Sequence, residues 1–173
     1  SDILFFFWHH KINTSWSTLS NNFKNVLEFI RANALFHSDM YYANEKKSFN
    51  LKPYSNSDPG VYFILYEDDI LKIGKADGKQ GLKGRVATYR TSLVSRYKQG
   101  DPTVLLWEKV MMKTLKGKIL KFYLLPLPPI KEVFKGIEVE LLMARSLEFK
   151  LSQFARDEGH SMLLSGQNWS IHN

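Results

Sequence analysis

Residues 60–75 read GVYFILYEDDILKIGK, two apolar runs joined by the acids at positions 67–69. The turn-forming sequence SNSDPG precedes them at positions 55–60, and aromatic and β-branched residues fill the first run. Short apolar runs that are bounded by turn residues and joined by a polar stretch are typical of a β-hairpin. We therefore expect an antiparallel pair of strands over residues 60–75.

Helical patterns lie on both sides of this hairpin. Apolar residues recur at three- and four-residue spacing from Leu19 to Ala34 and again from Ile137 to about Ala155, which predicts two amphipathic helices. A third helix, basic on its exposed side, is expected from Leu82 to about Lys98. These helices supply the apolar surfaces that a small sheet needs to cover its faces.

Further strands are expected at three places. Thr103 to Met112 and Gly117 to Leu125 are extended apolar patterns, and the prolines that follow at 126–129 end the pairing. Ile3 to Trp8 is interpreted as a buried strand. The sequence thus predicts an α+β fold in which a small antiparallel sheet is flanked by helices.

Length and composition predict one compact domain. The chain has 173 residues, of which 44% are hydrophobic, enough to bury a core. It has no cysteine, which excludes disulfides and cysteine-ligated zinc and fits a cytoplasmic protein. The apolar stretch at 3–8 is far shorter than the roughly 20 residues of a membrane span, so no membrane partner is expected.

The formal charge of +7 is concentrated in the middle of the chain. Positions 72–121 contain 13 Lys or Arg residues against 3 Asp or Glu residues, whereas the segments on either side are slightly acidic. A basic surface of this kind suits a phosphate backbone, because each neutralised phosphate releases condensed counterions. The candidate DNA-contacting residues of this segment are Lys79, Lys83, Arg90, Arg96 and Lys98.

Three short motifs resemble the GIY-YIG nuclease superfamily when taken together. Gly60-Val61-Tyr62 opens the predicted hairpin, Lys72-Ile73-Gly74 follows ten residues later, and Gly84-Arg85-Val86 lies in the basic helix. The resemblance covers residues 60–147 as the catalytic core and leaves residues 1–55 as an N-terminal helical and strand elaboration. Lys72 stands where most members have the second tyrosine, as in the branch of small restriction endonucleases.

The resemblance implies roles for the residues of these motifs. Tyr62 would take the proton from an attacking water. Lys72, together with Lys75, would lower the pKa of Tyr62, because an adjacent ammonium favours the phenolate. Arg85 would orient the scissile phosphate through its planar fork of donors and stabilise its developing charge. Tyr62, Lys72, Lys75 and Arg85 are therefore the candidate catalytic residues.

A glutamate on the second long helix would complete this site by binding Mg²⁺, with Mn²⁺ as a possible substitute. A single carboxylate, together with phosphate oxygens and water, is a common way to hold Mg²⁺. Helical phase places Glu140 in the middle of the apolar face of the helix predicted over 137–155, where a carboxylate needs a role. We expect Glu140 to be the metal ligand and keep Glu138 as the alternative.

The resulting hypothesis is a Mg²⁺-dependent endonuclease that acts on double-stranded DNA, of the sequence-specific type II restriction kind. A restriction enzyme that cuts both strands of a symmetric site is expected to act as a homodimer. Two alternatives remain open. One is a homing, repair or phage-type nuclease with the same catalytic residues, and the other is a non-catalytic nucleic-acid-binding module with the same fold.

Overall fold

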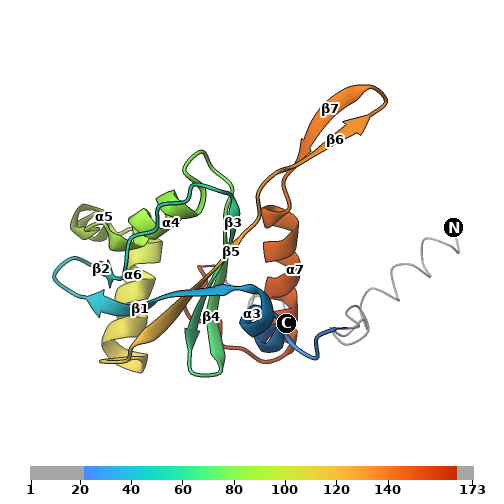
Figure 1. The fold of residues 1–173 in the computed structure, drawn as a ribbon. Helices are drawn as coiled ribbons and strands as arrows, with labels where there is room; N and C mark the ends of the chain where they lie inside the picture. Colours follow the sequence, from blue (N-terminus) through green and yellow to red (C-terminus); the bar gives the residue numbers. More distant parts are fainter. Residues whose placement is uncertain (1–21, 167–173) are drawn as a thin grey trace, which may run out of the picture.

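The computed structural model describes residues 22–166 and has an α+β architecture in three layers. A five-stranded antiparallel sheet lies between α3 (Val26–Asn33) and α7 (Ala144–Asp157) on one face and α4 (Gly81–Arg90) and α6 (Pro102–Lys109) on the other (Figure 1). The expected fold class is confirmed. The strand expected at Ile3 to Trp8 lies outside the described residues.

The sheet has the strand order β2-β1-β5-β3-β4, and every pair of neighbours is antiparallel. Its strands are β1 (Leu35–Ala43), β2 (Ser48–Asn50), β3 (Gly60–Tyr66), β4 (Asp69–Ala76) and β5 (Leu120–Pro126). The expected hairpin at 60–75 is confirmed as β3 and β4, and the strand expected at 117–125 is confirmed as β5. Because β1 pairs with β5, part of the N-terminal segment belongs to the same sheet as the hairpin.

Strand β3 is buried on both faces, which explains its unbroken apolar sequence. Val61 and Phe63 pack in the cluster formed with α3 and α7, whereas Tyr62 and Ile64 pack in the cluster formed with α4 and α6. Successive side chains of a strand point to opposite faces, so a strand covered on both sides has no exposed position. This strand therefore joins the two halves of the core.

Two expected helices begin or break at identifiable residues. The first three residues of the helix expected from Leu19 to Ala34 lie outside the described residues, and within the described part the helix begins at Val26. Asn25 caps it by accepting a hydrogen bond from the backbone N–H of Glu28. The basic helix expected at 82–98 is interrupted at Thr91, which has an extended backbone, and continues as α5 (Val94–Lys98).

The strand expected from Thr103 to Met112 is wrong. That segment forms α6 and a π-helical turn, η1 (Val110–Thr114). Asp101 caps the helix through its carboxylate, which accepts from the N–H groups of Thr103 and Val104, and Pro102 occupies the first turn. An aspartate followed by proline is a strong start signal for a helix, and it outweighs the apolar run that suggested a strand.

The helix expected from Ile137 to Ala155 is wrong over its first third. Residues 137–141 form strand β7 (Ile137–Leu141), which pairs with β6 (Ile130–Phe134), and α7 begins only at Ala144. Lys135 and Gly136 both have positive φ, at 50° and 82°, and form the tight turn between the two strands. This hairpin projects away from the three layers (Figure 1).

No helix within residues 22–166 is long and apolar enough to cross a membrane.

Gly74 leaves room for the ring of Tyr62. The two residues are partners across β3 and β4, and a Cβ added at Gly74 would lie 2.2 Å from Cζ and 2.3 Å from the hydroxyl oxygen of Tyr62. Atoms at such distances overlap, so any side chain at position 74 would displace the tyrosine. The glycine of the Lys-Ile-Gly motif therefore determines where the Tyr62 hydroxyl lies.

We expect Gly74→Ala to lower the free energy of unfolding by about 1–3 kcal/mol, the usual cost of overpacking a core. Urea denaturation followed by circular dichroism measures this change. Gly78→Ala is the matched control, because a Cβ there meets no atom within 4 Å and should leave stability nearly unchanged. Equal effects of the two substitutions would contradict the steric role of Gly74.

Candidate active site

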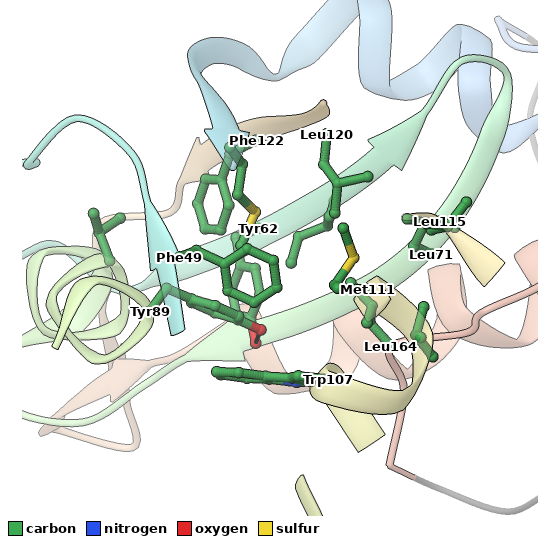
Figure 2. Close-up of a cluster of buried hydrophobic side chains, with 14 of the residues drawn as sticks. Phe49, Tyr62, Leu71, Tyr89, Trp107, Met111, Leu115, Leu120, Phe122 and Leu164 are labelled. Carbon is green, nitrogen blue, oxygen red and sulfur yellow. Dashed lines mark hydrogen bonds between the residues drawn. The ribbon is translucent and has the colours of Figure 1, made fainter. Parts of the chain in front are cut away.

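Tyr62 lies at the centre of an aromatic cluster and bonds to a second tyrosine. Its side chain is only 2% exposed, and its hydroxyl is 3.1 Å from the hydroxyl of Tyr89 on α4. The ring of Tyr89 in turn stacks on Trp107 of α6, with the centroids 4.8 Å apart (Figure 2). The helices on this face thus hold the Tyr62 hydroxyl in one position.

The pKa of Tyr62 is raised, and burial is the main cause. The charge of Arg85 and the hydrogen bond with Tyr89 lower this pKa, while the charge of Glu148 raises it further. The guanidinium carbon of Arg85 lies 5.9 Å from the centroid of the Tyr62 ring. The expected lowering of this pKa by Lys72 is wrong: the net shift is upward, and Arg85 is the cation that opposes it.

Lys72 lies on the same face of the hairpin as Tyr62. Lys72 pairs with Ile64 across β3 and β4, and Tyr62 pairs with Gly74 two positions away. Because residues two apart on a strand share a face, Lys72 and Tyr62 share one. Burial lowers the pKa of Lys72, the charge of Arg85 lowers it further, and the charge of Glu148 raises it. Lys72 is therefore a partly desolvated amine between a cation and an anion.

Glu148 is the carboxylate that belongs to this group. It lies in the second turn of α7, and burial raises its pKa, while the charges of Lys75, Lys72 and Arg156 lower it. Burial in turn lowers the pKa of Arg156, and the charge of Glu148 raises it. Residues of β3, β4, α4 and α7 thus meet in one electrostatically coupled cluster.

Glu140 and Glu138 lie elsewhere. Both are exposed residues of β7, and Glu138 forms an ion pair with Lys131 at 3.8 Å. The helical phase that favoured Glu140 does not apply to a strand. The same reasoning, applied to a helix that begins at Ala144, selects Glu148, which lies on the apolar stripe between Ala144 and Leu151.

Lys75 is half-buried at the end of β4 and faces acidic partners. Its ammonium lies 3.6 Å from the carboxylate of Asp77, which is also 4.0 Å from the guanidinium of Arg145 at the start of α7. Lys75 also acts on Glu148 by charge. Lys75 pairs with Val61, so it lies on the opposite face of the hairpin from Tyr62. The structure therefore brings Tyr62, Lys72 and Arg85 together with Glu148 and Tyr89, and it links Lys75 to this group through the charge of Glu148.

The candidate DNA-contacting residues fall into two groups. Lys79 and Lys83 are exposed at the N-terminal end of α4, the end nearer Arg85 along the chain. The others lie at the far end of α4 and on α5, where Arg90 donates to the carbonyl of Leu51 and Arg96 pairs with Asp101. Lys98 is exposed on α5.

The donors of this cluster fit a hard divalent cation held by one protein carboxylate. Within residues 22–166 no group of three or more His, Cys, Asp or Glu side chains converges on a metal position. Glu148 is the carboxylate of this cluster that could serve as the single protein ligand, although the charges of Lys75, Lys72 and Arg156 and a hydrogen bond with Ser152 also act on it. Mg²⁺ commonly binds in this way, through one or two carboxylates with substrate phosphates and waters.

The fold is shared with a phage nuclease. The structure of a mutant of bacteriophage T4 EndoII superposes with a TM-score of 0.53 at 12% identity, covering 79% of this chain and 96% of that chain. Restriction endonuclease HPY188I in complex with product DNA gives a TM-score of 0.45 at 18% identity, covering 83% and 86%. No protein-family model and no curated protein matches the sequence.

We expect Glu148→Gln to stabilise the protein at pH 7. Because the pKa of Glu148 is raised from 4.5, the folded state favours the neutral acid, and stability is lost as pH rises through that pKa. Glutamine resembles the neutral form and avoids this loss. Urea denaturation should show the gain at pH 7 and little difference near pH 4. A variant less stable than the wild type at pH 7 would contradict this account.

Proposed function

We propose that this protein is a Mg²⁺-dependent endonuclease of the GIY-YIG type that hydrolyses phosphodiester bonds in double-stranded DNA. The observation that carries the proposal is the meeting of Tyr62, Lys72, Arg85 and Glu148, which come from four separate elements. A buried tyrosine, a desolvated lysine and a half-buried glutamate in one cluster are costly for stability. Such groups gather where chemistry needs shifted pKa values.

In the proposed mechanism Tyr62 accepts the proton of the attacking water. The water oxygen forms the new bond to phosphorus and the P–O bond to the leaving sugar oxygen breaks. That oxygen takes a proton from a second water, and the proton held by Tyr62 returns to solvent. Arg85 binds the scissile phosphate and stabilises its developing charge. Tyr89 stabilises the phenolate of Tyr62 by donating to it, because their hydrogen bond lowers the pKa of Tyr62.

Glu148 would hold the Mg²⁺, which supplies Lewis-acid stabilisation of the phosphate charge when bound. Lys72 and Lys75 lower the pKa of Glu148, so their role here is to keep the carboxylate ionised despite its burial. This differs from a direct action of Lys72 on Tyr62. Glu148 thereby takes the part that the sequence assigns to Glu140 or Glu138, and the proposed catalytic core extends past residue 147 into α7.

Charge and the family resemblance both support DNA as the substrate. Lys79 and Lys83 are exposed cations near Arg85 in the sequence, and exposed cations of this kind suit a phosphate backbone. The lysine at position 72 supports the restriction branch, with a specific site and a pair of active sites that cut both strands. A homing, repair or phage-type nuclease remains the alternative, and discrete fragments from a long duplex, rather than a smear or branch-specific nicks, would favour restriction.

Cleavage of long unmethylated duplex DNA tests this proposal. With Mg²⁺, Tyr62→Phe and Glu148→Gln should each lower the cleavage rate at least about a hundredfold, since a positioned base alone contributes about 10²–10⁴-fold. Glu140→Gln is the matched control and should change the rate by less than about twofold, because solvated surface carboxylates contribute little. A gel series with and without Mg²⁺ measures the rates.

Two results would contradict this assignment. Full activity in Glu148→Gln with loss in Glu140→Gln would return the metal to β7. Duplex DNA that shifts on a native gel, yet is cut by no form of the protein on plain, branched or modified substrates, would favour the non-catalytic binding module.

The dependence of the rate on pH tests the pair of tyrosines. Because the pKa of Tyr62 is raised from 10.0, the phenolate is scarce at neutral pH and the rate should rise with pH. Tyr89→Phe removes a hydrogen bond that lowers this pKa, so the rate at pH 7 should fall about fivefold, equivalent to about 1 kcal/mol, and the rise should move to higher pH. Tyr123→Phe, on β5, is the control. An unshifted profile in Tyr89→Phe would contradict the stabilisation of the phenolate by Tyr89.

A further inference from the structure

The β6–β7 hairpin has one apolar face outside the main core. Residues that pair directly across two antiparallel strands share a face, and alternate pairs lie on opposite faces. The pairs Ile130–Leu141, Glu132–Val139 and Phe134–Ile137 therefore occupy one face, and the pairs Lys131–Glu140 and Val133–Glu138 occupy the other. We call the first set the apolar face of the hairpin. Glu132 is its only charged member.

This apolar face is open to solvent in a single chain. Phe134 is 64% exposed and Ile137 is 67% exposed, and Ile130 and Leu141 are also exposed. The hairpin extends beyond the layers of the fold (Figure 1). None of its apolar residues belongs to either buried core cluster. Large apolar side chains gathered on one face of a projecting element mark an interaction surface.

The hairpin also needs a partner for its own stability. A two-stranded hairpin is at best marginally stable in water unless its apolar face packs against another element. The pairing of β6 with β7 is regular over all five residue pairs. We therefore expect the apolar face of this regular, amphipathic hairpin to be covered in the functional state of the protein.

Charge argues against DNA as the covering partner. The hairpin carries Glu132, Glu138 and Glu140 against Lys131 and Lys135, so it is slightly acidic, unlike the basic segment at 72–121. Phosphate backbones attract cationic surfaces and gain nothing from apolar ones. A second protein surface with an apolar face fits better, and another copy of this hairpin offers one.

We propose that the apolar face of the β6–β7 hairpin is a homodimer interface that packs against the same face of a second copy. Phe134, Ile137, Leu141 and Ile130 are 64%, 67%, 48% and 42% exposed. If a fully exposed side chain of this kind offers roughly 150–250 Å², these four offer about 400 Å² per hairpin, and a pair would bury roughly 800 Å² of apolar surface. Apolar atoms make up about 65% of homodimer interfaces, which gives a total of about 1,200 Å². That is the lower end of specific, stable interfaces, and it predicts a dimer that dissociates on dilution.

A two-fold axis parallel to the strands suits this interface. Such an axis places β6 of one hairpin over β7 of the other, because it exchanges the two lateral edges of the facing sheets. Glu132 then lies over the partner's Val139 and at the edge of the contact, where its carboxylate reaches water. An axis perpendicular to the strands would instead bring the two Glu132 carboxylates together in the apolar layer, which is costly.

Sedimentation velocity over a concentration series tests the proposal on the full chain without DNA. We expect the wild type to pass from a monomer of 20.1 kDa to a dimer as concentration rises. Phe134→Thr with Ile137→Thr should weaken dimerisation at least about a hundredfold, because both side chains lie in the apolar face, while threonine keeps the strand propensity. Circular dichroism should show an unchanged fold, since neither residue is in the core.

Val133→Thr is the matched control, because Val133 is 69% exposed but lies on the opposite face. It should leave the dimer intact. A wild type that stays monomeric, a dimer that survives in the double variant, or equal loss in Val133→Thr would each overturn the proposal. In the first case the face is covered by residues outside 22–166 or by another protein.

Cross-linking gives a second and independent readout. The chain has no cysteine, so a single introduced cysteine reports on its own position. A short bismaleimide should join two copies of Ile137→Cys covalently and leave Val133→Cys without a cross-link, and the reverse pattern would overturn the proposal. Neither experiment uses DNA, so failure of the interface is distinguishable from failure of the proposed nuclease activity.

Discussion

The arrangement of the site depends on one steric constraint, the passage of the Tyr62 ring over Gly74. Strand β3 is buried on both faces, so its side chains have no freedom to move outward. Tyr62 is further fixed by Tyr89, which stacks on Trp107. Because the aromatic cluster is part of the main core, folding itself sets the position of the hydroxyl. A preorganised reactive group is the general requirement for catalysis by positioning.

Electrostatics around that hydroxyl work against stability. Burial raises the pKa of Tyr62 and of Glu148 and lowers that of Lys72, so burial opposes the charged form of each group. The cations Lys72 and Lys75 offset part of the cost of an ionised Glu148. A fold selected for stability alone would place apolar residues here. This cost is the physical basis of the proposal that the cluster serves chemistry rather than the stability of the core.

Local sequence patterns predicted much of this architecture. The errors arose where the start of a helix or strand was not recognised. The β3–β4 hairpin, β5 and the positions of Tyr62, Lys72 and Arg85 follow from turn residues and short spacings. The strand expected at 103–112 failed because Asp101-Pro102 starts a helix, and Glu148 was missed because the turn at Lys135-Gly136 was not recognised. Once that turn is recognised, residues 137–141 become the second strand of a hairpin, the helix begins at Ala144, and helical phase then selects Glu148. Exact distances among the site residues depend on packing between elements distant in sequence, which spacing does not encode.

The hairpin and the carboxylate lie on one continuous segment, which links assembly to the site. Strand β7 ends at Leu141, α7 begins at Ala144, and Glu148 follows in its second turn. A second copy packed on the hairpin would restrict the direction in which β7 enters α7. Tyr62 has no such link, since the core holds it from both sides. Assembly through the hairpin would therefore act on the position of Glu148, the proposed metal ligand, and leave Tyr62, the proposed base, in place. A monomeric variant should keep Tyr62 ordered whether or not the cleavage rate of that variant falls.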